Sequence, residues 1–118
     1  MTIKYSTIIV RDMTESIKFY TDVMGFKQDS QYKPPVPGTT ITLMKGPGEV
    51  MFELIENKAF PPGTYSTGIE VDNLEAALAH VRANGAKVIM EKTRTLVGSM
   101  AMIEDPNGAK LALIHHHT

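Results

Sequence analysis

The chain has 118 residues, of which 42% are hydrophobic and 21% charged, and its formal net charge is −1. We therefore expect one domain spanning residues 1–118, with no electrostatic basis for binding nucleic acid or an anionic membrane. The absence of cysteine excludes disulfides, thiolate chemistry and Cys-ligated zinc. The N-terminal residues lack an apolar signal region and no apolar run approaches a membrane span, which favours a soluble, cytoplasmic protein.

The first half of the chain is typical of a strand, a helix and three strands. Residues 3–10 are β-branched and aromatic, and they alternate as a strand does. Asp12 and Glu15 form a capping-box pattern that begins a helix, and Gly25 supplies its C-terminal stop. Three further strands are expected at residues 26–32, 39–44 and 50–55.

The second half repeats this order. Residues 65–71 favour a strand, Asp72 with Glu75 forms a second capping-box pattern, and Gly85 closes the helix. Strands are expected at 87–91 and 97–103, and at 110–114 after the Asp105-Pro106-Asn107-Gly108 turn. The apolar positions of the two helices match in pairs: Met13 with Leu74, Ile17 with Leu78, and Tyr20 with Val81.

This periodicity predicts an internal duplication, with repeat 1 at residues 1–56, repeat 2 at 64–115 and a linker at 57–63. Each helix can cover only one face of a sheet, so the other face must be buried in a different way. The predicted fold class is α+β: two βαβββ repeats forming a cupped, mostly antiparallel sheet with the helices on its outer face. The residues that line the cup are the candidates for function.

Two motifs carry a resemblance to a known family. The helix has the pattern Asp12-Met13, Ile17-Lys18-Phe19-Tyr20, Met24-Gly25-Phe26, and the last strand follows the Asp105-Pro106-Asn107-Gly108 turn. Together with the duplicated strand order, these motifs resemble the vicinal oxygen chelate superfamily. That group includes glyoxalase I, extradiol dioxygenases, fosfomycin-resistance proteins and bleomycin-binding proteins.

The resemblance implies four positions where metal-dependent members place their ligands, two in each repeat. Those positions fall on Tyr5, Glu53, Ser66 and Ala112. Divalent ions of this kind need several His or carboxylate ligands, and only Glu53 keeps such a side chain. We therefore predict that the protein has neither a metal site nor a cofactor. The internal histidine, His80, lies in the second predicted helix, where an ordinary surface role is expected.

What remains is a predicted cavity for a small organic ligand. By strand alternation, seven residues lie on the same strand faces as the four implied ligand positions: Tyr5, Thr7, Met51, Glu53, Ser66, Lys110 and Ala112. Glu53 has two interpretations: a general base or polar anchor, or a structural carboxylate paired with Lys110 or hydrogen-bonded by Tyr5 and Ser66. Lys110 itself fits either the cavity or a solvated turn. The methionines Met51, Met100 and Met102 fit an adaptable pocket or ordinary core packing.

Two function hypotheses follow. The first is a metal-independent binding protein of the bleomycin-resistance kind that sequesters a drug or metabolite, in a homodimer. The second is a glyoxalase-type lyase or isomerase in which Glu53 moves a proton next to a carbonyl, with or without a loosely held metal. The Pro-rich segment 33–38 and the linker 57–63 are candidate rims of the cavity or plain connections. His115, His116 and His117 are interpreted as a tag remnant or frayed tail, with a metal-binding tail as the alternative.

Overall fold

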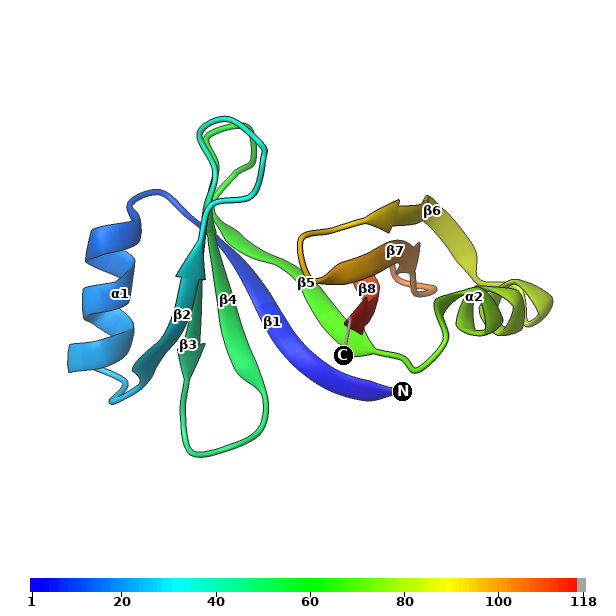
Figure 1. The fold of residues 1–118 in the computed structure, drawn as a ribbon, viewed down its shortest axis with the longest axis horizontal. Coiled ribbons are helices and arrows are strands. Elements are labelled where there is room, and N and C mark those ends of the chain that lie inside the picture. Colours follow the sequence, from blue (N-terminus) through cyan, green and yellow to red (C-terminus); the bar gives the residue numbers. More distant parts are fainter. Residues whose placement is uncertain (117–118) are drawn as a thin grey trace. The chain divides into compact units, whose positions relative to one another are not determined.

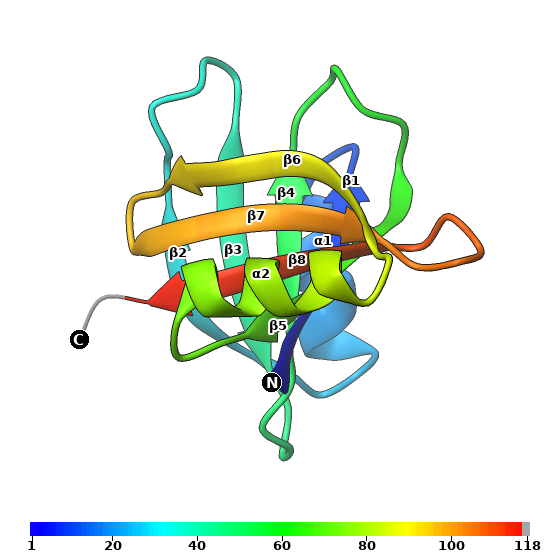
Figure 2. The same cartoon turned by 90° about the vertical axis from the view of Figure 1, so that its right-hand side faces the viewer.

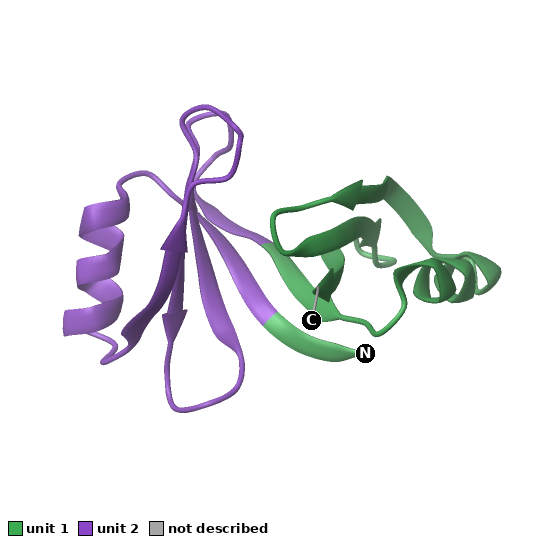
Figure 3. Cartoon of the chain, viewed as in Figure 1, with its two compact units in different colours: residues 1–4, 66–118 green, residues 5–65 purple. Residues whose placement is uncertain are grey.

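The computed structural model describes residues 1–116 and contains eight strands and two helices in the order βαβββ followed by βαβββ (Figure 1). The chain divides into two compact units (Figure 3). Unit 2 comprises residues 5–65, and unit 1 comprises residues 1–4 with those from 66 onward. The predicted class, an α+β fold of two βαβββ repeats, is confirmed.

Unit 2 consists of a four-stranded sheet and one helix. Its elements are β1 (Thr2–Val10, from residue 5), α1 (Met13–Asp22), β2 (Lys27–Tyr32), β3 (Thr40–Lys45) and β4 (Met51–Glu56). The strands run in the order β2-β3-β4-β1, with β1 parallel to β4 and the other neighbours antiparallel. The parallel pair is possible because α1 and two strands intervene in the chain.

Unit 1 repeats this arrangement. Its elements are β5 (Gly63–Glu70, from residue 66), α2 (Leu74–Ala83), β6 (Lys87–Arg94), β7 (Gly98–Glu104) and β8 (Lys110–His116). The order is β5-β8-β7-β6, with β5 parallel to β8 and the other neighbours antiparallel. Figure 2 shows α2 lying along the strands of this unit. Four of the six pairings within the units are antiparallel and two are parallel, so the mostly antiparallel sheet is also confirmed.

Each helix buries one face of its own sheet. In unit 2 the core beneath α1 consists of Val10, Met13, Met44 and Leu54, with Ile8, Ile17, Tyr20, Phe26 and Phe52 packed against it. In unit 1 the core beneath α2 consists of Val71, Leu74, Ala77, Leu78, Ala101, Ile103 and Leu113. Because strand side chains alternate between faces, the residues between these core positions lie on the opposite, helix-free face of each sheet. Neither helix, at ten residues each, is long and apolar enough to cross a membrane within the described chain.

The helix starts confirm one predicted cap and correct the other. Asp12 caps α1, and its carboxylate accepts a hydrogen bond from the Glu15 amide at 2.9 Å. Asp72 was predicted to cap the second helix, but the cap is Asn73, which accepts from the Ala76 amide at 3.0 Å. An asparagine side-chain oxygen caps a helix as well as a carboxylate does, so α2 begins one residue later than the acidic pattern indicates.

The C-terminal end also differs from its prediction. The strand expected to end at Ile114 continues to His116, so His115 and His116 are not a frayed tail. The His115 ring lies 3.2 Å from the Val71 carbonyl oxygen, and His116 lies 3.3 Å from the Glu70 carboxylate. His117 lies outside the described residues. Residues 57–62 form the irregular connection that the sequence predicts, although β5 begins at Gly63 rather than Tyr65.

Candidate functional site

The helix-free face of unit 2 carries the candidate site, which we call the Glu53 face. Its members follow from the strand register: Tyr5, Thr7, Ile9, Lys27, Ser30, Tyr32, Ile41, Leu43, Lys45, Met51, Glu53 and Ile55. Tyr5, Thr7, Ile9 and Leu43 are buried, whereas Lys27 and Lys45 are exposed. Glu53 is half-buried and lies between Thr7 on β1 and Leu43 on β3. The face therefore combines a buried, partly apolar centre with one half-buried carboxylate, and it has two exposed lysines where β2 begins and β3 ends.

Glu53 is held by a neighbouring hydroxyl. The Thr7 hydroxyl, on a residue only 4% exposed, donates a hydrogen bond of 2.8 Å to the Glu53 carboxylate. On the same face, burial and the nearby negative charge of Glu53 raise the pKa of Tyr32 to about 12. Tyr32 therefore stays neutral at ordinary pH and keeps a phenolic O–H that can donate. A carboxylate, a hydroxyl and a phenol on one face can orient a small polar molecule.

Unit 1 presents a matching face with different side chains at the equivalent step. Gly68 and Ala112 are register partners on β5 and β8, as Thr7 and Glu53 are on β1 and β4. Ser66 and Ala112 are both buried, and Lys110 is half-buried opposite Glu104. The duplication predicted from sequence, which aligns Tyr5 with Ser66 and Glu53 with Ala112, agrees with these registers. The hydrogen-bonded pair Thr7–Glu53 of unit 2 therefore has no polar counterpart at the Gly68–Ala112 step of unit 1.

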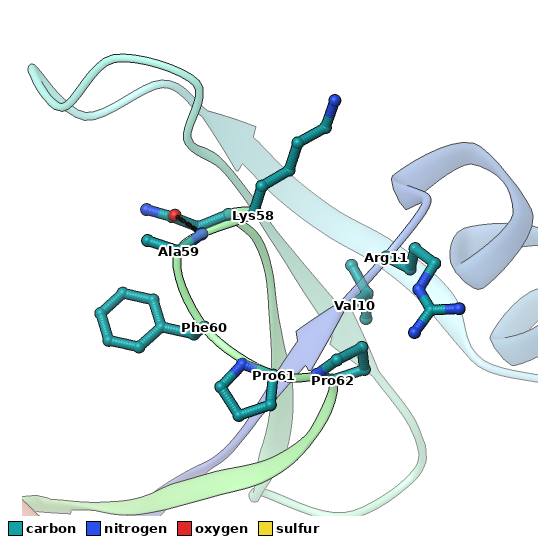
Figure 4. A pocket seen from close by; sticks show the side chains of 8 residues that line it. Val10, Arg11, Lys58, Ala59, Phe60, Pro61 and Pro62 are labelled. Carbon is teal, nitrogen blue, oxygen red and sulfur yellow. Dashed lines mark hydrogen bonds between the residues drawn. The ribbon is translucent and has the colours of Figure 1, made fainter.

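A depression opens beyond the ends of β1 and β4 (Figure 4), and we call it the Arg11 depression. Its volume is about 450 Å³, and its lining residues are Val10, Arg11, Asn57, Lys58, Ala59, Phe60, Pro61 and Pro62. Asn57 fixes the connection, because its side chain donates to the Thr39 hydroxyl at 2.9 Å and accepts from the Ala59 amide at 2.8 Å. Residues 57–62 thus line this depression, and whether the segment 57–63 is a rim of a ligand cavity stays a prediction.

The seven predicted ligand-lining residues fall into two groups. Tyr5, Thr7, Met51 and Glu53 share the Glu53 face, and Ser66, Lys110 and Ala112 share the helix-free face of unit 1. Met102 is buried and Met100 half-buried on this second face. Whether these groups bind a ligand stays a prediction. His80 is exposed on α2, as expected.

Sequence reasoning missed Tyr32 and Arg11. Pairing of β2 with β3 places Tyr32 opposite Ile41 and hence on the Glu53 face. A register shift between Gln28 and Ser30 breaks the simple alternation along β2, so the sequence pattern alone could not assign that side. Arg11 lies in the connection between β1 and α1, where strand alternation does not assign a side.

A family model described as the Glyoxalase/Bleomycin resistance protein/Dioxygenase superfamily matches residues 2–113. The chain belongs to this superfamily. It is 30% identical to a lactoylglutathione lyase of Haemophilus influenzae, with 98% of this chain and 93% of that protein covered. It is 31% identical to a lactoylglutathione lyase of Salmonella typhimurium, with 97% and 92% covered.

Solved structures with the glyoxalase-superfamily fold are also similar to this chain. A hypothetical protein from Bacillus halodurans matches with a TM-score of 0.88 at 20% identity, covering 99% of this chain and 95% of that one. The methylmalonyl-CoA epimerase from Mycobacterium tuberculosis matches with a TM-score of 0.85 at 19% identity, covering 99% and 89%. At these identities the likeness shows the fold alone.

The donor atoms of this glyoxalase-superfamily chain do not fit the metal that the resemblance implies. Of the four implied positions, Ala112 has no donor, and Tyr5 and Ser66 carry neutral hydroxyls. The remaining carboxylate, Glu53, already accepts a hydrogen bond from Thr7. Within residues 1–116 no three His, Cys, Asp or Glu side chains form a group that could hold a metal ion. A single carboxylate is too small a ligand set for a divalent ion.

Proposed function

We propose that this protein binds a small organic molecule on the Glu53 face and recognises it directly, without a metal ion. One observation carries the proposal: the Glu53 carboxylate accepts a hydrogen bond from the Thr7 hydroxyl and lies beside the apolar side chain of Leu43. The carboxylate anchors a hydroxyl, amine or amide of the ligand, and the isoleucine and leucine side chains contact its apolar part. Sequestration of a drug or metabolite, as in the bleomycin-resistance branch, is the simplest form of this function.

A thermal-shift experiment tests this proposal with three probes: bleomycin, S-hexylglutathione and propionyl-CoA. The protein is first treated with EDTA. A ligand at a hundredfold its Kd stabilises the folded state by about 2.7 kcal/mol, which gives a clear rise in Tm. At least one probe is expected to raise Tm, and Glu53→Gln is expected to reduce that rise.

The matched control is Glu49→Gln, which removes a carboxylate from the exposed turn between β3 and β4 of the same unit. This variant should respond to the probes as the wild type does. A rise in Tm that is identical in Glu53→Gln, or that occurs only after a divalent metal is added, would overturn the proposal.

A second candidate function is proton transfer, in a lyase or isomerase. The observation that favours it is the placement of Glu53 beside two neutral hydroxyl donors, Thr7 and Tyr32. In such an enzyme the Glu53 carboxylate would remove a proton from the carbon next to a carbonyl. The Tyr32 phenol would donate to the resulting oxyanion, because the hydrogen of the Thr7 hydroxyl is already donated to Glu53. The hydroxyls would stay in place when substrate binds, so little reorganisation would be needed.

Two assays separate the enzyme from the binding protein. One follows conversion of the methylglyoxal–glutathione hemithioacetal, and the other follows deuterium exchange into methylmalonyl-CoA in heavy water. Activity of EDTA-treated protein that disappears in Glu53→Gln and persists in Glu49→Gln would establish the enzyme. The absence of both activities, together with probe binding, would establish the binding function.

We also propose a homodimer, which analytical ultracentrifugation would measure as twice the chain mass of 13.0 kDa.

A further inference from the structure

We propose that Asn107 is a site of spontaneous covalent modification, at which the side chain deamidates and the main chain isomerises to isoaspartate. The inference is independent of the proposed function. It rests on a comparison within the chain, because the sequence Asn-Gly-Ala-Lys occurs twice, at residues 84–87 and 107–110. The structure holds the two copies differently, and the second copy is the one that reacts.

The reaction is intramolecular and consumes only water. The main-chain nitrogen that follows an asparagine attacks the side-chain carbonyl carbon and loses its proton. The new C–N bond closes a cyclic imide, and the side-chain nitrogen leaves as ammonia. Water then opens the imide at either carbonyl carbon, which gives aspartate or isoaspartate. Glycine favours the attack because it has no Cβ to hinder the nitrogen and its backbone is permissive. Of the chain's four asparagines, Asn84 and Asn107 precede a glycine.

The glycine of each copy offers the same attacking group. Both glycines and both asparagines are exposed. Gly85 and Gly108 have nearly the same positive φ, 86° and 85°, and a Cβ at either position would meet no atom within 4 Å. The amide of each glycine donates to a carbonyl three residues earlier, to Arg82 at 3.0 Å and to Asp105 at 3.1 Å. A difference in rate must therefore come from the asparagine side chain.

The Asn84 side chain is held by the helix that it terminates. Asn84 is the C-cap of α2, and its side-chain nitrogen donates to the His80 carbonyl at 2.9 Å. Its backbone amide donates to the same carbonyl at 3.2 Å. The side-chain bond directs the amide group toward the preceding turn of α2, whereas the reaction requires it to face the Gly85 nitrogen. This bond must therefore break before Asn84 can react.

The Asn107 side chain has no such restraint, since within residues 1–116 it makes no hydrogen bond to the main chain. The turn is held instead by the Asp105 carboxylate, which accepts from the backbone amides of Asn107 and Ala109, each at 2.8 Å. The Ala109 and Asn107 amides lower the pKa of Asp105 most, and the Asn107 side chain lowers it further. Because Asn107 is exposed, water can replace this last contact when the side chain turns toward Gly108.

Modification at Asn107 alters the start of β8. Isoaspartate carries the main chain through its side chain, which inserts one methylene group between the two amides that donate to Asp105. The insertion lies just before Lys110, the first residue of β8, which pairs with Glu104. Either product also places a second carboxylate next to that of Asp105, where like charges repel. The modified chain should therefore be less stable than the intact one.

Peptide mapping by mass spectrometry, after long incubation of the folded protein in mildly alkaline buffer, tests this inference. Trypsin separates the two copies, because it releases residues 83–87 and residues 95–110 as different peptides. We expect Asn107 to deamidate about tenfold faster than Asn84, which is the effect of one more hydrogen bond that must break. An enzyme that methylates the free α-carboxylate of isoaspartate should label residues 95–110 of the incubated protein.

Denatured protein and two variants provide the controls. In guanidinium the two copies should react at similar rates, because their sequences are the same from the asparagine onward. Asn107→Gln should abolish the modification of residues 95–110, since glutamine must close a larger ring. Asn84→Gln is the matched substitution and should leave that modification unchanged. The Tm of the wild type should fall during incubation as isoaspartate accumulates, and Asn107→Gln should keep its Tm.

Three results would overturn the inference. The first is a rate at Asn84 that equals or exceeds the rate at Asn107 in the folded protein. The second is a faster reaction at Asn107 that persists unchanged in guanidinium, because the sequence and not the structure would then cause it. The third is no product at Asn107 in the folded protein while the denatured protein reacts, which would mean that the turn protects both reacting groups.

Discussion

The Thr7 hydroxyl donates a hydrogen bond of 2.8 Å to the Glu53 carboxylate across the parallel strands β1 and β4. At the equivalent step of unit 1, the partners on β5 and β8 are Gly68 and Ala112. The two repeats therefore have the same strand pairing at this step and differ in the side chains that it carries. One repeat has a carboxylate with a fixed hydroxyl partner, and the other has no polar side chain at the matching step. This difference favours recognition of an organic ligand without a metal ion.

Removal of the Thr7 hydroxyl should destabilise the protein. Thr7→Val keeps the shape of a buried side chain but leaves the half-buried Glu53 carboxylate without this donor. We expect a loss of about 1–2 kcal/mol in the free energy of unfolding, measured by urea denaturation at pH 7. In a double-mutant cycle with Glu53→Gln, the two losses should be clearly non-additive. Additive losses would mean that the two side chains do not interact.

Tyr32 should report the charge of Glu53. Burial first, and then the negative charge of Glu53, raise the pKa of Tyr32 from 10.0 to about 12. In Glu53→Gln the charge is removed while burial remains, so the pKa of Tyr32 should fall part of the way toward 10.0. Carbon-13 labelling of tyrosine with resonance assignment would measure it. An unchanged titration in Glu53→Gln would show that Glu53 does not act on Tyr32.

The same pKa predicts how stability changes in alkali. The pKa of Tyr32 is higher in the folded than in the unfolded state, so the folded state retains a proton that the unfolded state loses. Its contribution to stability is fully present below pH 10.0 and is lost as the pH rises toward about 12. Tyr32→Phe should remove this part of the pH dependence, and guanidinium unfolding at several alkaline pH values would measure it.

The corrected helix cap can be tested with three substitutions. Asp12→Ala and Asn73→Ala each remove a side-chain acceptor from the first turn of a helix. Each should lower the free energy of unfolding by about 1 kcal/mol in urea denaturation. Asp72→Ala, at the position that the acidic pattern favours, should have an effect well below that of Asn73→Ala. The reverse ranking of Asp72 and Asn73 would contradict the observed start of α2.

The turn before β8 should lose stability in acid. The backbone amides of Ala109 and Asn107 donate to the Asp105 carboxylate at 2.8 Å, and these bonds hold its pKa below the usual 3.8. A lowered pKa stabilises the fold above pH 3.8, and the contribution is lost as the pH falls through the lower folded value. The difference in Tm between wild type and Asp105→Asn should therefore shrink as the pH is lowered below 3.8.

The sequence predicted most of the fold because its signals were local. Alternation defined the strands, apolar stripes at helical spacing defined the helices, and the Asp105-Pro106-Asn107-Gly108 turn formed with a hydrogen bond from the Gly108 amide to the Asp105 carbonyl at 3.1 Å. The second cap was misplaced because Asp72 and Asn73 are both good capping residues, and Glu75 favoured the wrong one. β8 was predicted too short because a run of histidines has no strand pattern.

The candidate site was harder to predict because part of it depends on register between strands. Thr7 and Glu53 could be assigned from alternation and duplication. Tyr32 could not, since the shift between Gln28 and Ser30 changes which side of β2 its side chain occupies. Arg11 and Lys58 lie in connections, where no periodicity relates one residue to another. Both residues line the same depression because β1 and β4, which precede them in the chain, pair side by side.

The central claim is that the protein recognises an organic ligand without a metal ion. Its most direct test is a calorimetric titration of metal-free protein with Ni²⁺, Zn²⁺ and Mn²⁺. The chain should carry glutamine in place of His115, His116 and His117, so that the C-terminal histidines contribute no ligands. We predict that this chain binds no stoichiometric ion and that Glu53→Gln in the same background gives an identical titration. One tightly bound ion per chain that is lost in Glu53→Gln would contradict the account.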